Sequence, residues 1–485
     1  MDNQRVPAFT RRSVISSTAA ATIGAVIPNL WVPISNAASN PRGNLHAAPS
    51  QSKLDSDFAE PATLWRFNGS VPGPEIRVRQ GTQLRVTVNN GLAEDTTVHW
   101  HGVRTPNAMD GVPYLTQKPI SPGNQFEYDF NAVDAGTYWY HPHQRSFEQV
   151  GRGLYGALIV EEENPVLVDR DVTWMLDDWR LEQTGEVEDD FGNSHDMSHS
   201  GRIGNFVTIN GKKRGTFPVS KGERIRLRLI NAANARIFSL AFQGHKPSII
   251  ALDGQPVTPH QPENGVVTLG PAMRVDLILD MTGNPGESNE VIDSFYDGLA
   301  YQLTHIRYSD EVIRDRPPDW PIQLPANPLK EPDMKTAKRH EVVFSGGMMG
   351  NMVARDMGIN TTTSNSMMGM MGMMHSKKIW FVNGVAAEGH IMDPMLTLDL
   401  DRSHVIAMTN ASAWYHPIHL HGHSFRVISR NGEKTNYQEW QDTVLMAPRE
   451  IVEIAFVADN PGDWMFHCHI LEHQASGMMG VIRVA

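Results

Sequence analysis

The only cysteine of this 485-residue chain, Cys468, lies between two histidines in the segment His467-Cys-His469. His473 follows five positions after this cysteine and Met478 ten positions after it. A thiolate, an imidazole and a thioether this close together are the soft ligand set of a blue-copper electron-transfer site. That set lacks one imidazole, which the earlier cluster His416-Pro-Ile-His419-Leu-His421 can supply.

Side chains alternate along a strand, and this divides the histidines between two sites. The two histidines that flank Cys468 point away from it. In the earlier cluster, His419 and His421 share one face and His416 takes the other. We therefore expect one copper surrounded by His416, Cys468, His473 and Met478, and a second metal site on the opposite side surrounded by His419, His421, His467 and His469.

Two more His-x-His pairs lie far upstream, His99-Trp-His101 and His141-Pro-His143. A single pair of this kind is most often an ordinary core or surface pair. Four pairs, with the lone cysteine inside one of them, instead indicate a metal cluster. Their eight histidines are enough for three coppers at two or three nitrogens apiece.

The ordered set of four motifs resembles that of the multicopper oxidases, a family that includes laccases, cuprous oxidases and ferroxidases. The resemblance covers the whole of the expected mature chain, and it implies four copper ions with no ligand position missing. It implies a type 1 copper bound by His416, Cys468 and His473, with Met478 as the weak axial ligand. It also implies a type 2 copper bound by His99 and His419, and a type 3 pair bound by His101, His141, His143, His421, His467 and His469.

Residues 1–38 are expected to be an export signal. Arg11 and Arg12 precede a modest apolar run at 19–27, and small residues close the segment at 37–38. This order is typical of a twin-arginine signal, and the alternative is a loosely basic tail. The apolar run is shorter than the roughly 20 residues of a spanning helix. We therefore expect a periplasmic protein that meets the twin-arginine export machinery and has no membrane span.

Composition narrows the function further. A single cysteine excludes internal disulfides. The net charge of −12 argues against a nucleic-acid partner, whose phosphates would be repelled. About 450 mature residues suggest about three domains, and we expect a monomer.

The strand signal extends along the whole chain and predicts an all-β protein. Polar and apolar residues alternate at 82–88, 223–229 and 274–279, between turns rich in Gly, Pro and Asn. A phrase that begins near 81 recurs near 222 and 401, which predicts three copies of one antiparallel sandwich domain. The expected domains are 39–165, 166–335 and 336–485.

The family resemblance implies that these domains are cupredoxin-like Greek-key sandwiches, with the three-copper site between the first and the third. The middle domain carries no His-x-His pair, and we expect it to be a spacer. Its segment His195-Asp-Met-Ser-His199 could bind a metal, but a solvated loop is the expectation.

Cys468 is bonded through the backbone to His467 and His469, which gives electrons a covalent route between the two sites. Four electrons reduce O2 to two waters, and this reaction also consumes four protons. By resemblance, Glu472 and Asp110 are the expected proton-delivery residues. The alternative for each is a carboxylate that orients a ligand imidazole.

A methionine-rich segment at 345–375 holds ten methionines. Gly, Ser, Asn and Thr separate them without a helix or strand period, whereas core methionines would follow one. Thioethers favour Cu(I) over Cu(II), so we expect the segment to capture Cu(I). It resembles the insert of periplasmic cuprous oxidases, and this implies a role in copper tolerance.

The sequence departs from that group just before the third motif. An Asp and a Met hold substrate copper there in cuprous oxidases, whereas Ser412 and Trp414 stand near those positions here. The substrate copper site is therefore expected to use Asp356 with Met349, Met352 or Met357. Alternatively, Trp414 and Tyr415 form an aromatic wall that favours phenols.

Three functions follow from these residues. The first is a cuprous oxidase with laccase-like activity, using O2 and Cu(I) or phenolic donors. The second is a laccase acting on phenols or aromatic amines, with the methionines as accessory copper sites. The third is a copper-sequestering protein, against which the complete ligand set weighs because storage needs no oxygen-reducing cluster.

Overall fold

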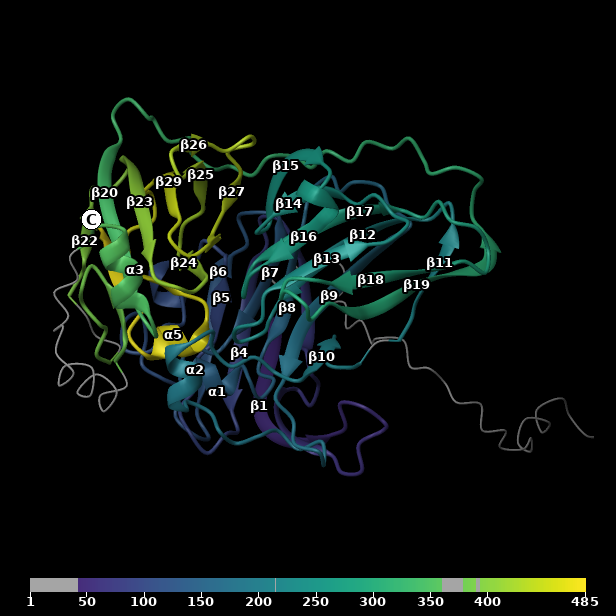
Figure 1. Cartoon of the computed structure of the whole chain (residues 1–485), viewed down its shortest axis with the longest axis horizontal. Coiled ribbons are helices and arrows are strands. Elements are labelled where there is room, and N and C mark those ends of the chain that lie inside the picture. Colours follow the sequence, from purple (N-terminus) through teal and green to yellow (C-terminus); the bar gives the residue numbers. More distant parts are fainter. Residues whose placement is uncertain (1–41, 214, 360–377, 390–392) are drawn as a thin grey trace, which may run out of the picture. The chain divides into compact units, whose positions relative to one another are not determined.

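Among the residues that the structure describes, six β-sheets hold nearly all of the regular structure, and they pack in three pairs (Figure 1). The computed structural model describes residues 42–213, 215–359, 378–389 and 393–485, so the expected export signal and the methionines at 367–374 lie outside the described residues. All six sheets belong to one compact unit of the chain. The expected all-β fold is confirmed.

The first pair of sheets is built from residues 42–161, with the strand orders β2-β1-β4-β6 and β3-β8-β7-β5. Buried side chains such as Val86, Tyr138 and Leu158 form its core. The strands are β1 (Arg42–Ser52), β2 (Ala62–Phe67), β3 (Gly73–Arg79), β4 (Gln83–Asn90), β5 (His99–His101), β6 (Gln125–Asn131), β7 (Gly136–His141) and β8 (Gly156–Glu161).

The second pair is built from residues 170–312, with the orders β10-β9-β12-β17-β14-β15 and β11-β19-β18-β13-β16. Leu227, Leu240 and Leu277 lie in its core. The strands are β9 (Arg170–Trp179), β10 (Phe206–Ile209), β11 (Phe217–Lys221), β12 (Arg224–Asn231), β13 (Phe238–Phe242), β14 (Ser248–Leu252), β15 (Gln255–His260), β16 (Val266–Leu269), β17 (Arg274–Asp280), β18 (Ser288–Asp293) and β19 (Tyr301–Val312).

The third pair is built from residues 338–484, with the orders β21-β20-β23-β29-β25-β26, where β27 also pairs with β25, and β22-β31-β30-β24-β28. Its core contains Ile406, Ile418 and Phe466. The strands are β20 (Lys338–Gly346), β21 (Trp380–Val382), β22 (Leu396–Leu398), β23 (Ser403–Ala411), β24 (His416–Leu420), β25 (Phe425–Arg430), β26 (Glu433–Lys434), β27 (Trp440–Gln441), β28 (Thr443–Met446), β29 (Ile451–Val457), β30 (Gly462–Cys468) and β31 (Met479–Val484).

The three copies of the repeated sequence phrase fall on equivalent strands. Each of β4, β12 and β23 lies between one parallel and one antiparallel neighbour. The neighbours are β1 and β6, β9 and β17, and β20 and β29 respectively. This equivalence supports three repeats of one domain type. The boundaries near 165 and 335 fall in the connections after β8 and β19 and stay predictions.

The sheets are mixed, whereas the alternating patterns alone predicted antiparallel ones. Each sheet contains one parallel pair: β1 with β4, β3 with β8, β9 with β12, β11 with β19, β20 with β23, and β22 with β31. Parallel neighbours cannot be joined by a tight hairpin, so the chain crosses to the opposite sheet before it returns. Local alternation carries no information about that crossing.

Two strands with the same alternating sequence differ in burial. β4 alternates between buried and half-buried residues, as its sequence predicts. Every residue of β12 is buried, including Arg226 and Arg228. Arg226 pairs with Glu162 and Asp276, and Arg228 pairs with Asp171 and Asp276. Since Glu162 directly follows β8, the first pair of sheets covers the charged face of β12.

Short helices connect the strands: η1 (Asn107–Met109), α1 (Ser146–Gln149), α2 (Ser194–Ser198), η2 (Glu263–Gly265), α3 (Gly350–Asp356) and α5 (Leu471–Ala475). Helices α1, α2 and α5 come from the first, second and third segments of the chain, and they lie side by side (Figure 1). Within the described residues, no helix is long and apolar enough to cross a membrane.

Candidate metal centres

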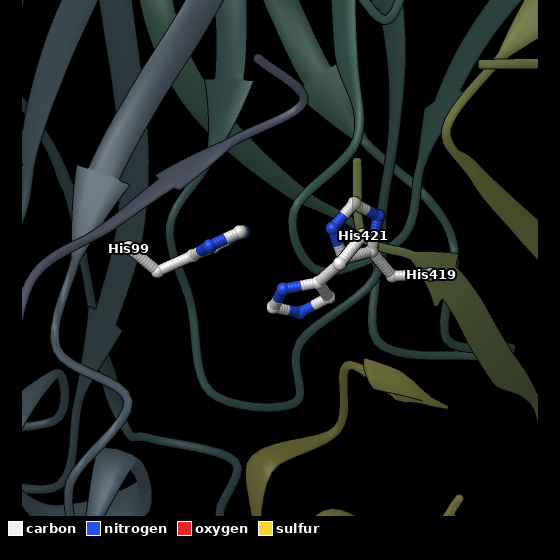
Figure 2. Close-up of side chains that lie close together, drawn as sticks. All are labelled: His99, His419 and His421. Atoms are coloured by element: carbon white, nitrogen blue, oxygen red, sulfur yellow. The ribbon is translucent and has the colours of Figure 1, made fainter. Parts of the chain in front are cut away.

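The four His-x-His pairs meet where the first and third pairs of sheets face one another. In the first pair, β5 and β7 place His99 opposite His141. In the third pair, β24 and β30 place His419 opposite His467. Figure 2 shows His99 beside His419 and His421, and the ring centroids of His99 and His421 are 4.0 Å apart. The fold thus brings together histidines from opposite ends of the chain.

The alternation along each strand explains why two histidines reach the same face. On β5, Trp100 packs into the first core from its place between His99 and His101. At the end of β30, Cys468 packs into the third core. The histidines on either side of each of these residues therefore point out of the core and toward the other domain.

Eight buried imidazoles form one cluster, which we call the histidine cluster: His99, His101, His141, His143, His419, His421, His467 and His469. Several sets of three place nitrogen atoms within 4.8 Å of one another, close enough to share a metal ion. These sets are His99 with His419 and His421, His99 with His101 and His141, and His143 with His421 and His467. His469 joins through its Nε2, 3.4 Å from His141 Nε2.

Backbone carbonyls determine which ring nitrogen faces the centre of the cluster. A carbonyl oxygen only accepts, so an imidazole nitrogen bonded to it must carry the proton, and the other nitrogen keeps the lone pair. Four Nδ1–H groups are held in this way at 2.7–3.0 Å: His99 by Asp110 O, His141 by Pro142 O, His419 by Asp442 O and His467 by Cys468 O. Each of these rings presents its Nε2 lone pair.

The imidazole nitrogens that make no hydrogen bond could bind a metal ion. Nε2 of His99, His143 and His419 and Nδ1 of His101 are buried and have no hydrogen-bond partner among the residues that the structure describes. Leaving a buried polar atom unpaired costs about 1–3 kcal/mol. A metal ion that accepts these lone pairs removes the cost, as expected of a copper-binding cluster.

Burial also keeps the rings in the form that binds metal. It lowers the pKa of the imidazoles, and in most of them the neighbouring imidazoles lower the pKa further. The affected rings are His101, His141, His143, His419, His421, His467 and His469. Neutral imidazole is the metal ligand, so no proton has to be displaced at neutral pH.

A second and smaller group surrounds Cys468. Its Sγ lies 3.4 Å from His416 Nδ1 and 3.7 Å from His473 Nδ1, and all three residues are fully buried. Met478 lies in the same core, and its carbonyl accepts a hydrogen bond from the Cys468 N–H at 3.1 Å. The ligand atoms of His416, Cys468 and His473 are close enough to one another to share one metal ion.

The chemistry of this group fits copper. Burial raises the pKa of the Cys468 thiol, so without a cation the sulfur stays protonated. A bound cation reverses this preference, because it stabilises the thiolate directly. One thiolate, two imidazoles and a nearby thioether are the ligands of a blue-copper centre.

Ser412 and Trp414, the two residues that mark the sequence departure before the third motif, make hydrogen bonds close to His416. The Ser412 hydroxyl donates to Asn410 Oδ1 at 2.7 Å and accepts from His416 Nε2 at 2.8 Å. This fixes His416 with Nδ1 toward Cys468. Trp414 Nε1 donates to Met348 O at 3.1 Å and ties α3 to the same region.

The two acidic candidates lie in different surroundings. Asp110 contacts the histidine cluster directly, because its Oδ2 accepts from His421 Nδ1 at 2.8 Å. Glu472 is buried on α5, and its Oε1 accepts from Asn234 Nδ2 at 3.0 Å. Burial raises the pKa of Glu472 to about 7. Proton delivery stays a prediction for both residues.

A buried ion pair that no motif predicted lies beside the histidine cluster. Arg274 of β17 donates to both carboxylate oxygens of Asp442, at 2.8 and 2.5 Å. Asp442 Oδ1 in turn lies 3.2 Å from His101 Nε2. Gly102 makes room for this pair: it has a φ of +82°, and a Cβ there would lie 2.3 Å from the Arg274 guanidinium. An arginine in an apolar strand was the only signal in the sequence.

Residues 194–198 form helix α2, so the solvated loop expected at 195–199 was wrong. Three successive carbonyls at the end of this helix accept hydrogen bonds from the third domain: Met197 O from Trp380 Nε1, Ser198 O from Met348 N and His199 O from His473 Nε2. The middle segment therefore contacts a candidate metal ligand and is more than a spacer.

The residues expected to hold substrate copper lie on and around α3. Met349 and Met352 are 54% and 51% exposed. Asp356 is also exposed, and its carboxylate pairs with Arg449 at 2.9 Å. Met357 is half-buried at the end of the helix. All four residues lie within or at the ends of α3, and substrate binding there stays a prediction.

Known proteins are similar to this chain in both sequence and fold. Three family models described as multicopper oxidase match residues 50–165, 170–288 and 360–485. The crystal structure of a multi-copper oxidase from Pseudomonas thermotolerans has 33% sequence identity and a TM-score of 0.79, over 92% of this chain and 99% of the other.

Two further relatives differ in the activity that their names state. A multicopper oxidase of Campylobacter jejuni, described as a metallo-oxidase, is 27% identical with a TM-score of 0.77, over 94% of this chain and 93% of the other. Laccase-1 of Botryotinia fuckeliana is 28% identical over 88% of this chain and 79% of its own length. The chain is therefore a member of the multicopper oxidases, copper-dependent oxidoreductases that pass electrons from a donor to O2.

Proposed function

We propose that this chain is a cuprous oxidase that oxidises Cu(I) to Cu(II) with O2, contributes to copper tolerance and has laccase-like side activity. The observation that carries this proposal is that the Nε2 edge of the His473 ring is covered by the end of α2. The His473 Nε2 donates to His199 O at 2.6 Å and the ring is fully buried, so this nitrogen is closed to direct contact with an organic donor. A metal ion bound at the surface above needs no direct contact with this ring.

Exposed thioethers close to this edge support a soft metal ion as the donor. Met348, Met349 and Met352 are 41%, 54% and 51% exposed. The backbone of Met348 is hydrogen-bonded both to α2, through Ser198 O, and to Trp414. Thioether sulfur prefers Cu(I) to Cu(II), so these side chains favour the reduced ion.

Four copper ions are the proposed cofactors. His416, Cys468, His473 and Met478 would hold the type 1 ion. Of the histidine cluster, His99 and His419 would hold the type 2 ion, and His101, His141, His143, His421, His467 and His469 the type 3 pair. When bound, copper supplies the one-electron oxidation of the donor and the four-electron reduction of O2 to two waters.

The residues of the chain position these groups and connect them. Cys468 is covalently joined to His467 and His469, so the two candidate centres are linked by the backbone of β30. The carbonyls that hold the histidine Nδ1–H groups keep the rings in place. Glu472 and Asp110 are the proposed sources of the protons that the reduction of O2 consumes.

We also propose that the protein is a monomer and that the twin-arginine machinery exports it to the periplasm. The paired arginines at 11–12 and the short apolar run at 19–27 support this location. Oxidation of Cu(I) there would produce the ion that crosses membranes less readily.

A laccase acting on phenols or aromatic amines is the second candidate, and one observation favours it. Tyr415 follows Trp414 and precedes His416, and it is 37% exposed. Its ring packs edge-on against Phe295 with a centroid distance of 5.3 Å. An aromatic donor could stack on this surface.

Oxygen uptake with Cu(I) and with a phenolic donor separates the two functions. We would compare the copper-loaded wild type with a variant that combines Met348→Leu, Met349→Leu and Met352→Leu. Met334→Leu is the matched control, since this methionine is 50% exposed and lies in the connection before β20. Copper content per chain is measured in each sample, and about four tightly bound ions are expected.

A cuprous oxidase loses Cu(I) turnover in the triple variant and keeps it in the control. Equal Cu(I) turnover in the wild type and the triple variant, together with faster oxidation of the phenol, would support the laccase. Many weakly bound copper ions without oxygen uptake would instead indicate a sequestering protein.

A further inference from the structure

We infer that Asp442 positions two rings of the histidine cluster, assisted by the hydroxyl of the next residue, Thr443. The two rings are those of His101, a proposed type 3 ligand, and His419, a proposed type 2 ligand, so one carboxylate serves ligands of different copper ions. This inference rests on the proposed function, since it concerns how two of the proposed copper ligands are held. The contacts of Asp442 with each ring and the ion pair that fixes its carboxylate support it.

The first ring, His101, is held with its proton on the nitrogen that faces away from the cluster. Its Nε2 lies 3.2 Å from Asp442 Oδ1 and 3.1 Å from Thr443 Oγ1. An ionised carboxylate only accepts, so Nε2 carries the proton. The lone pair is then on Nδ1, which is buried and has no hydrogen-bond partner among the residues that the structure describes. His101 therefore presents Nδ1 to a metal, whereas the four rings held by backbone carbonyls present Nε2.

The second ring, His419, is held by the same two residues. Asp442 O accepts from His419 Nδ1 at 2.8 Å, and Asp442 Oδ1 lies 3.4 Å from that nitrogen. Thr443 lies opposite His419 where β28 pairs with β24, and its Oγ1 is 3.1 Å from the same Nδ1. The rings of His101 and His419 stack with their centroids 3.8 Å apart. Residues 442–443 thus contact both rings of this stack at the nitrogens that carry protons.

The ion pair with Arg274 keeps the carboxylate ionised and in one orientation. Arg274 donates to Asp442 Oδ1 at 2.8 Å and to Oδ2 at 2.5 Å, and two such bonds fix the plane of a carboxylate. The Thr443 hydroxyl also donates to Oδ1, at 2.8 Å. Asp253 accepts from Arg274 N at 2.9 Å and from Thr443 N at 3.1 Å. The second domain therefore fixes the group that holds ligands of the first and third domains.

Direct binding of a metal ion by Asp442 is the alternative role. His101, His419 and Asp442 each have an atom close enough to the others to share an ion. However, both carboxylate oxygens already accept from Arg274, and the guanidinium charge beside them repels a second cation. The ring nitrogens that face Asp442 carry protons and have no lone pair to offer. Asp442 therefore holds the rings and does not bind the metal itself.

A change at Asp442 should act on one centre only. Without the carboxylate, His101 loses the acceptor that keeps its proton on Nε2, and the proton can move to the nitrogen that a copper ion needs. Loss of a group that holds a ligand ring typically weakens metal affinity by about 10–100-fold. The ligands around Cys468 form a separate group, so their copper should stay in place.

The test uses the full copper-loaded protein and the variant Asp442→Asn. An amide has one oxygen acceptor where a carboxylate has two, so asparagine cannot accept from Arg274 and from His101 as aspartate does. Asp463→Asn is the matched control, because Asp463 accepts two bonds from Arg483 at 2.7 Å on a 29% exposed side chain. After dialysis against a chelator, we would measure copper per chain, the EPR signal of type 2 copper and the blue absorption.

We expect Asp442→Asn to bind copper in the histidine cluster about 10–100-fold more weakly, with a reduced type 2 signal, and to keep its blue absorption. The control should match the wild type. If the ion pair only links the domains, the variant unfolds at lower urea concentration but keeps its copper and its type 2 signal, and this result overturns the inference. Loss of the blue absorption to the same degree also overturns it, because the effect is then not confined to the cluster.

Thr443→Val keeps the ion pair and carries the test if Asp442→Asn does not fold. Valine has the shape of threonine but lacks the hydroxyl that lies against both rings. The same selective loss of copper is expected, and unchanged copper content and type 2 signal overturn the inference. Wild-type protein that holds copper in the cluster but does not oxidise Cu(I) overturns the proposed function and leaves this inference standing. Wild-type protein that holds no copper there overturns both.

Discussion

At the scale of single residues, the two acidic candidates have different tasks to perform. Asp110 Oδ2 accepts a hydrogen bond from His421 Nδ1 at 2.8 Å, and this bond orients a ring of the histidine cluster. Glu472 is buried, and its Oε1 accepts a hydrogen bond from Asn234 Nδ2 at 3.0 Å. Burial raises the pKa of Glu472 to about 7, so this carboxyl can hold and release a proton near neutral pH. We therefore expect Glu472 to be the stronger candidate for proton delivery.

The variant Glu472→Gln tests this role. The wild-type carboxyl is protonated below about pH 7 and ionised above it, so turnover limited by proton delivery should fall as the pH rises through this value. Glutamine keeps the hydrogen bond from Asn234 but cannot release a proton, and turnover should drop by about 100-fold. Oxygen uptake is measured from about pH 5 to about pH 9 at equal copper content. An unchanged rate and pH profile would remove Glu472 from proton delivery.

At the scale of elements, local sequence patterns predicted the strands and which face of a strand each histidine occupies. They did not predict the contacts between domains. The alternation at 82–88, 223–229 and 274–279 corresponds to β4, β12 and β17. The spacing of the His-x-His pairs likewise identified segments that the fold brings together. Arg274, Asn234 and the His199 carbonyl stayed hidden, because each reaches a centre only after the second domain packs on the others. No spacing within one element records that contact.

The Arg274–Asp442 ion pair is one contact between domains whose contribution to stability can be predicted. Both residues are fully buried, and Arg274 also donates to Thr137 O, so the pair joins β17 to the first and third domains. Arg274→Gln leaves the Asp442 carboxylate buried without its cation, which should lower the free energy of unfolding by about 3–5 kcal/mol. Urea denaturation of the copper-free protein measures the loss.

The matched control is Arg483→Gln, which breaks an exposed pair with Asp463 at 2.7 Å. A surface pair of this kind contributes about 0–1 kcal/mol. If both variants unfold at the same urea concentration, the buried pair does not hold the domains together. Copper content is followed as well, since Asp442 Oδ1 lies 3.2 Å from His101 Nε2 and a shifted carboxylate would disturb that ring.

At the scale of the whole molecule, the histidines that gather between the first and third domains make the copper-free protein sensitive to acid. Burial lowers the pKa of nine candidate ligands in the folded chain, whereas in the unfolded chain they titrate near 6.5. These are His101, His141, His143, His416, His419, His421, His467, His469 and His473. Below about pH 6.5 the unfolded chain therefore binds more protons than the folded one.

Stability should accordingly be fully present above about pH 6.5 and fall as the pH drops below it, by up to about 1.4 kcal/mol per pH unit for each imidazole. Buried carboxyls with a raised pKa, such as Asp177 and Glu472, act in the opposite direction, but the imidazoles outnumber them. Calorimetry of the copper-free protein should show a Tm that is steady above about pH 6.5 and falls steeply from about pH 6.5 to about pH 5. His143→Gln should make this decline less steep, because the unfolded variant takes up one proton fewer. A Tm that stays constant over this range would mean that the folded histidines accept protons as readily as those of the unfolded chain.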